Sequence, residues 1–186
     1  YQGEPVEWRV LDKKDGEILL LSEYGLDAQP FDTSGKSRVD WKDSTIRKWL
    51  NDDFYNSAFS EKEKENIVES KSEGFEEYNT SMNLTGGGKP YAYLEREIED
   101  KVFLLSNTEL CAYFSEDPYP GCYSDPYAHK ELLCYPTAYA KQQLETRYQT
   151  ETCGWWLCNH VYEDDSVELV SAYGQGSGTS RENIKA

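Results

Sequence analysis

The chain has no apolar run approaching the roughly 20 residues that a membrane-spanning helix needs, and it has few basic residues. Lysine and arginine number 19 against 35 acidic residues, which gives a formal net charge of −16. This charge repels phosphate backbones and anionic lipid headgroups, so we expect neither a nucleic-acid partner nor membrane insertion. At 186 residues the chain is long enough to bury one core, and a single, monomeric domain over 1–186 is expected.

Cysteine and histidine are also scarce, with five cysteines and two histidines. An odd number of cysteines leaves at least one thiol unpaired within a monomer. The cysteine spacings do not match the paired clusters of structural zinc sites, and five cysteines are too few for a disulfide scaffold. The composition therefore favours small buried thiols with at most one disulfide, and it predicts no cofactor.

The first residues predict a β-hairpin. Val6, Trp8 and Val10 alternate with charged residues, and Asp15-Gly16 supplies a tight turn before the second arm, 17–22. That second arm contains Ile18-Leu19-Leu20-Leu21, which is apolar on both faces. Because such a strand is typically covered on both sides, a central strand is expected there.

Helical spacing follows from Asp43 onward. Asp43 or Ser44 is placed to cap a helix over about 45–56, and Ser60 with Glu63 forms a capping box before a shorter helix that carries Ile67 and Val68 inward. Residues 71–100 are acidic and glycine-rich, which indicates a surface excursion. A second excursion is expected over 115–135, which holds three prolines.

The second half of the chain alternates strand and helix signals. The apolar segment 102–105 predicts a strand, and Ser106 with Glu109 predicts a capped helix through Phe114. Further along, the pattern predicts a helix from Pro136-Thr137, a strand containing Trp155-Trp156 that lines the core, and another strand over 167–170, before a glycine- and serine-rich tail. This order of elements predicts an α+β fold.

Several ordered motifs resemble an uncharacterised bacterial domain family that is often exported. They are Glu7-Trp8-Arg9-Val10-Leu11, Ile46-Arg47-Lys48-Trp49-Leu50-Asn51, Asp53-Phe54-Tyr55, Ala58-Phe59-Ser60, Asp100-Lys101-Val102-Phe103-Leu104-Leu105-Ser106, Pro136-Thr137-Ala138-Tyr139-Ala140-Lys141 and Trp155-Trp156-Leu157. That family is similar to the C-type-lectin-like fold, which formylglycine-generating enzymes and bacterial ligand-display proteins share. The resemblance implies an α+β, C-type-lectin-like domain.

The chain departs from that family's pattern at two places. After the tryptophans the family has Arg-Ser-Pro-Gly, whereas here Cys158-Asn159-His160-Val161 follows. The family's closing Val-Arg-Pro-Ala does not follow Lys185-Ala186, so a closing strand is expected to be missing after residue 186. The resemblance leads us to expect export to the cell surface or the extracellular space. The first residue, Tyr1, which is not methionine, agrees with this expectation.

The function expected first is noncatalytic binding or display of a glycan or protein ligand. Tyr119, Tyr123 and Tyr127 in the second excursion are the candidate ligand-binding residues, because tyrosine stacks on sugars and fills protein interfaces at low entropy cost. The same tyrosines could equally pack their own loop.

The alternative is a copper-dependent oxidase that resembles formylglycine-generating enzymes. Cys153 and Cys158 are separated by four residues, as in that family's cysteine pair, and thiolates are preferred copper(I) ligands. Residues five apart in a regular strand face opposite sides, so this site needs a bulge or turn.

Two further sites are open to a metal or a hydrolytic reaction. One uses His129 or His160, with Cys153 and Cys158 as companions of His160 in a zinc site. The other is a calcium site at Glu163-Asp164-Asp165 and Glu168, although acidic turns in so acidic a chain are usually only solvated.

Overall fold

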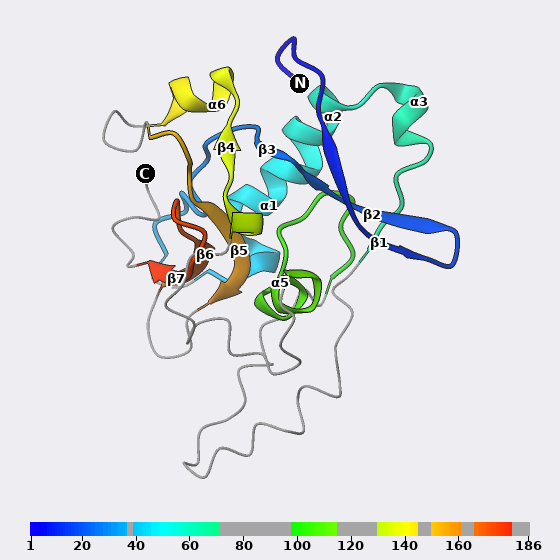
Figure 1. Cartoon of the computed structure of the whole chain (residues 1–186). Coiled ribbons are helices and arrows are strands. Elements are labelled where there is room, and N and C mark those ends of the chain that lie inside the picture. The colour runs from blue at the N-terminus through cyan, green and yellow to red at the C-terminus, as the bar shows by residue number, and fades with distance from the viewer. Residues whose placement is uncertain (37–38, 71–97, 115–129, 145–149, 161–165, 180–186) are drawn as a thin grey trace.

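The computed structural model describes residues 1–36, 39–70, 98–114, 130–144, 150–160 and 166–179. Within these ranges a helical segment lies between a projecting hairpin and a three-stranded sheet (Figure 1). No described helix is both long enough and apolar enough to cross a membrane. The mixture of short strands and short helices confirms the predicted α+β class, while the C-type-lectin-like assignment stays a prediction.

The predicted hairpin is present. Strand β1 (Trp8–Lys14) pairs antiparallel with β2 (Glu17–Ser22), and the turn residues Asp15 and Gly16 have φ of 52° and 88°. Both values lie in the left-handed region that two-residue hairpin turns require, which explains the aspartate-glycine pair. A register shift between Val10 and Asp12 places a bulge on β1 at Leu11.

The prediction that β2 is a central strand is wrong. Among the described residues β2 pairs with β1 alone, in a two-stranded sheet. Leu19 and Leu21 face the body of the protein and are half-buried, whereas Ile18 and Leu20 are 55% and 45% exposed. The strand is therefore covered on one face only, because no second layer of the described chain reaches its outer face.

One continuous helical segment follows, made of α1 (Thr45–Trp49), the π-helical turn η2 (Leu50–Phe54) and α2 (Tyr55–Ala58), after the short 3-10 helix η1 (Trp41–Asp43). Ser44 is its N-cap, since the Ser44 hydroxyl accepts a hydrogen bond from the Arg47 N–H, as the sequence predicts. The buried side chains along the segment include Ile46, Leu50 and Phe54.

Helix α3 (Glu61–Lys64) carries the predicted capping box between Ser60 and Glu63. The helix ends before Ile67 and Val68, so the prediction that it turns both inward is wrong: Ile67 is half-buried and Val68 is exposed. Beyond it, Ser70 and Asp100 exchange two backbone hydrogen bonds of 2.9 Å, which joins the two ends of the interval 71–99.

Residues 102–105 do not form the predicted strand. The segment forms no strand ladder with any described residue. Backbone groups in and beside the segment bond elsewhere. The Asn51 side-chain oxygen accepts hydrogen bonds from the N–H groups of Lys101 and Val102. Leu105 O accepts a hydrogen bond from Cys158 N at 3.0 Å. Apolar character alone therefore indicated a segment that packs against the core, but not a strand.

Two capped helices match the sequence. In α5 (Asn107–Phe114) the Ser106 and Glu109 side chains bond reciprocally to each other's N–H groups, and in α6 (Ala138–Gln143) the Thr137 hydroxyl accepts from Ala140 N. Between them lie the short 3-10 helix η4 (Lys130–Leu132) and strand β4 (Tyr135–Pro136), which pairs parallel with β3 (Tyr24–Gly25).

The tryptophan strand is confirmed as β5 (Trp155–His160). It pairs with β6 (Val167–Val170), and β6 pairs with β7 (Gly176–Thr179), in the order β5-β6-β7. The glycine- and serine-rich composition of β7 gave no strand signal, so the sequence analysis did not predict it.

Strand β5 separates two apolar clusters. Trp156 and Cys158 face the first, with Phe31, Trp41 and residues of α1 and η2. Trp155 and Leu157 face the second, with Leu105, Leu110, Leu132 and Val170. Each indole N–H donates to a carbonyl, Trp155 to Leu132 O and Trp156 to Gln29 O. The expectation that both tryptophans line the core is confirmed, and alternation along the strand explains why they serve different clusters.

Candidate functional site

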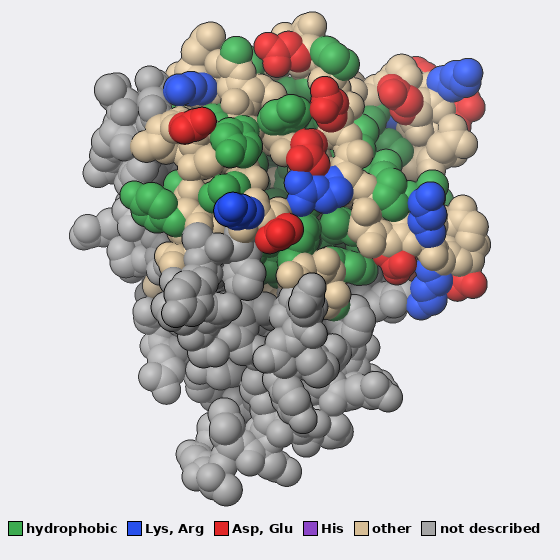
Figure 2. All heavy atoms as spheres, in the orientation of Figure 1, with side chains coloured by type: hydrophobic (Ala, Val, Ile, Leu, Met, Phe, Trp, Pro, Cys, Tyr) green, Lys and Arg blue, Asp and Glu red, His purple; other side chains and the backbone are tan. Residues whose placement is uncertain are grey.

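The outer face of the hairpin exposes four apolar side chains, which we call the hairpin face: Trp8, Val10, Ile18 and Leu20. They are between 37% and 55% exposed. Val10 is paired with Leu20 across the two strands, and Trp8 and Ile18 lie two residues from these along the same face. In Figure 1 the hairpin extends away from the β5–β7 sheet, and Figure 2 shows apolar side chains reaching the described surface among charged ones.

The inner face of the hairpin is anchored to the body. Leu11 and Leu21 pack against the second apolar cluster. Arg9 donates to both carboxylate oxygens of Glu23, at 2.9 and 2.7 Å, and to Glu131 O at 2.9 Å. The outer face also touches the body at its base, where the Trp8 ring stacks on Phe59 with centroids 6.0 Å apart. The hairpin is therefore fixed in orientation, while Val10, Ile18 and Leu20 stay exposed on its outer face.

The Arg9–Glu23 pair gives the hairpin a pH dependence. The hydrogen bond from Arg9 lowers the pKa of the Glu23 carboxyl. Because a lowered folded-state pKa stabilises the protein above the unfolded pKa, this contribution is lost as pH falls through the lower, folded value. We expect the half-exposed pair to contribute at most about 1 kcal/mol, and Glu23→Gln to flatten the fall in unfolding free energy between about pH 5 and pH 3.

Urea unfolding across that pH interval measures the effect. Glu17→Gln is the matched control, because Glu17 is an exposed carboxylate of the same hairpin. Parallel pH profiles for Glu23→Gln and the unmodified chain would contradict the assignment.

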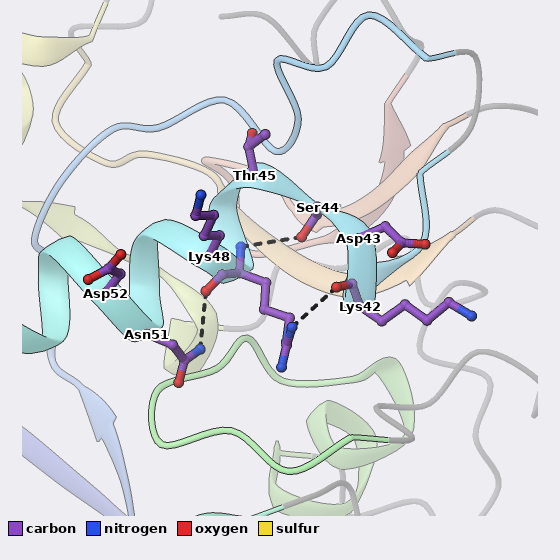
Figure 3. A pocket seen from close by; sticks show the side chains of 8 residues that line it. Lys42, Asp43, Ser44, Thr45, Lys48, Asn51 and Asp52 are labelled. Atoms are coloured by element: carbon purple, nitrogen blue, oxygen red, sulfur yellow. Dashed lines mark hydrogen bonds between the residues drawn. The ribbon is translucent and has the colours of Figure 1, made fainter.

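A second candidate is a surface pocket of about 470 Å³ beside α1, lined by residues between 42 and 52 (Figure 3). Arg47 donates to Asp100 Oδ1 at 2.8 Å and to Lys42 O at 3.2 Å, and Asn51 donates to Val102 O at 2.8 Å. Asp100 is 3% exposed and also accepts from the Trp41 indole N–H at 2.9 Å. Arg47 and Asn51, which line the pocket, thus hold the segment 100–102 against the helix.

The two candidate cysteines have different surroundings. Cys158 is buried in the first apolar cluster, and its sulfur lies 3.9 Å from Asn159 Oδ1. Cys153 is half-buried and lies opposite Cys134, with which it forms an isolated antiparallel bridge. The structure thus gives Cys153 a partner that sequence spacing did not suggest. A copper site on Cys153 and Cys158 stays a prediction.

Most other predicted site residues lie outside the described ranges: Tyr119, Tyr123, Tyr127, His129 and the turn 163–165. The side chain of His160 is likewise not described. Glu168 is buried in β6 and accepts from Asn107 Nδ2 at 3.0 Å. Within the part of the chain that is described, no cluster of three or more histidine, cysteine or acidic side chains is arranged to hold a metal ion.

The hairpin face is not among the sites that the sequence predicts. A sequence signal for this face does exist, because residues 18–21 are apolar on both faces of the strand. That pattern predicts a second layer of this chain over the strand, which none of the described elements provides.

An α+β domain with an apolar, outward-facing hairpin is thus the class that the geometry defines. The chain belongs to the family described as Domain of unknown function (DUF6273), which matches residues 15–186. This confirms that the family is an uncharacterised one. The match begins within the hairpin turn, so it includes β2 but not β1. No curated protein and no solved structure matches the chain.

Proposed function

We propose that the chain is a noncatalytic binding domain of an exported bacterial protein, and that its ligand is another protein that docks on the hairpin face. One observation carries the proposal. Strand β2 has the composition of a strand covered on both sides, yet Ile18 and Leu20 are open to solvent. A partner that covers this face would remove apolar surface that the chain itself leaves exposed.

The chemistry of the hairpin face favours a protein over other ligands. Three of its four side chains are aliphatic, and these offer a sugar neither an aromatic face nor a hydrogen bond. Residues 8–22 hold three basic and three acidic side chains, so the hairpin is neutral in a chain of net charge −16. An apolar, neutral or basic protein segment meets no repulsion here, whereas a second copy of the chain does.

The edges of the hairpin favour an extended segment as the occupant. A sheet edge presents unpaired N–H and C=O groups that can accept a further strand. The β1 edge is protected by the bulge at Leu11 and by Lys13 and Lys14, which are features that discourage pairing. Strand β2, over Glu17–Ser22, contains no bulge, proline or lysine. We therefore assign the docking strand to the β2 edge.

Selection of a random peptide library on the immobilised full chain tests this proposal. The expected winners are extended peptides that alternate apolar with neutral or basic residues. We expect Leu20→Lys to weaken their binding by about tenfold or more, because a central apolar anchor is replaced by a charge. Binding to the unmodified chain should also slow hydrogen exchange at the amides of β2.

Val68→Lys is the matched control, since Val68 is an exposed apolar side chain that is not part of the hairpin. Peptides whose binding is insensitive to Leu20→Lys would overturn the assignment. A glycan that binds the chain and is lost when Tyr119, Tyr123 and Tyr127 become serine would overturn it in favour of a glycan ligand bound by the second excursion.

A further inference from the structure

Cys134 and Cys153 are directly opposed across an isolated antiparallel bridge, in which Cys153 N donates to Cys134 O at 2.8 Å. Directly opposed residues in antiparallel pairs have Cα atoms about 4.5–5.5 Å apart, within the roughly 4.4–6.8 Å range of disulfides. The backbone therefore already meets the separation that a disulfide needs.

The two sulfurs converge on Gly25. A Cβ atom added at Gly25 would lie 3.0 Å from the Cys153 sulfur and 3.3 Å from the Cys134 sulfur. Strand β3 thus supports both thiols from one side, and a larger residue there would press on both. Both cysteines are half-buried rather than sealed in the core.

We propose that Cys134 and Cys153 form a disulfide by exchange with an external disulfide, either of a small molecule or of another protein. In the first step a Cys153 thiolate attacks one sulfur of the external disulfide, which forms a mixed disulfide and releases one thiolate. The Cys134 thiol then loses its proton and attacks the Cys153 sulfur, which expels the second thiolate. Two protein thiols are oxidised, the external disulfide is reduced to two thiols, and both protons end on these.

The environment of the pair assigns the order of the two steps. The hydrogen bond between the thiols lowers the pKa of Cys153, and the same bond, with burial, raises the pKa of Cys134. Because the thiolate is the nucleophile in exchange, Cys153 attacks first and Cys134 resolves the mixed disulfide.

The bond would join two parts of the fold. Cys134 directly precedes β4, and Cys153 lies two residues before β5. Closing the interval 134–153 restricts the unfolded chain, so the oxidised protein should be more resistant to heat. Cys158 is unaffected, because it lies in the first apolar cluster.

Peptide mapping of the full chain tests the proposal. The reduced protein is equilibrated with oxidised glutathione, quenched in acid, alkylated and digested, and the peptides are identified by mass spectrometry. We expect the Cys134 and Cys153 peptides to be linked and the Cys158 peptide to be alkylated. The oxidised protein should melt about 5–10 °C above the reduced one.

Two variants separate this pair from the other thiols. Cys158→Ser should retain the link, whereas Cys153→Ser should lose both the link and the difference in melting temperature. If Cys153→Ser fails to fold, the map of the unmodified chain still decides. Cys134 and Cys153 both alkylated after equilibration, or each linked to a different cysteine, overturns the proposal.

Discussion

Replacing Asp100 by alanine is expected to lower the free energy of unfolding by about 3 kcal/mol. The Asp100 carboxylate is 3% exposed and accepts hydrogen bonds from the Trp41 indole at 2.9 Å and the Arg47 guanidinium at 2.8 Å. Its removal leaves a buried indole N–H without an acceptor and a partly buried cation without its counter-charge. Urea unfolding measures the loss.

Two comparisons sharpen this result. Asp100→Asn keeps one acceptor oxygen and removes the charge, so it should cost less than Asp100→Ala. Asp53→Ala is the control, because Asp53 is an exposed carboxylate of the neighbouring helical turn and should change stability by no more than about 0.5 kcal/mol. Equal effects of Asp100→Ala and Asp53→Ala would show that the buried network contributes little.

Replacing Leu157 by alanine should cost a similar amount, about 3–4 kcal/mol. Leu157 is fully buried in β5, where it packs in the second apolar cluster with Leu105, Leu110 and Leu132. The truncation removes buried methyl groups and leaves a cavity that three different elements would have to move to fill. Denaturant unfolding measures the change.

Val68→Ala is the matched truncation at an exposed site and should change the unfolding free energy by no more than about 0.5 kcal/mol. Leu157→Met, which nearly conserves volume, should cost less than about 1.5 kcal/mol. A loss below that value for Leu157→Ala would mean that the cluster around β5 collapses easily around a cavity.

Local signals in the sequence predicted local structure well. Ser44, Ser60 and Thr137 each cap the helix that their spacing predicts, and the Asp15-Gly16 turn closes the predicted hairpin. These features succeed because a capping hydroxyl and a left-handed turn depend on residues only two or three positions away.

Features that depend on distant residues could not be predicted in this way. Residues 102–105 are apolar enough for a strand, but Val102 bonds to the Asn51 side chain and Leu105 to Cys158 of β5, without a strand ladder. Strand β7 has a composition that gives no strand signal and forms only because β6 lies beside it. Tertiary context outweighs intrinsic strand preference in both cases.

The candidate sites also combine features that nearby residues determine with features that distant residues determine. The apolar pattern at Ile18 and Leu20 was visible in the sequence, but its exposure depends on which layers the fold provides. Spacing suggested pairing Cys153 with Cys158, five positions away. Only the bridge between Cys134 and Cys153 reveals the partner nineteen positions away, because no short-range pattern encodes it.

The paired backbones of Ser70 and Asp100 bear on how this domain can vary between related proteins. Their two hydrogen bonds fix both ends of the interval 71–99, and Arg47 and Trp41 hold Asp100 from the other side. Once the ends of an interval are fixed, doubling its length adds only about 0.6 kcal/mol of closure entropy. The entropy of closure between Ser70 and Asp100 therefore sets only a small penalty on a longer connection in related proteins.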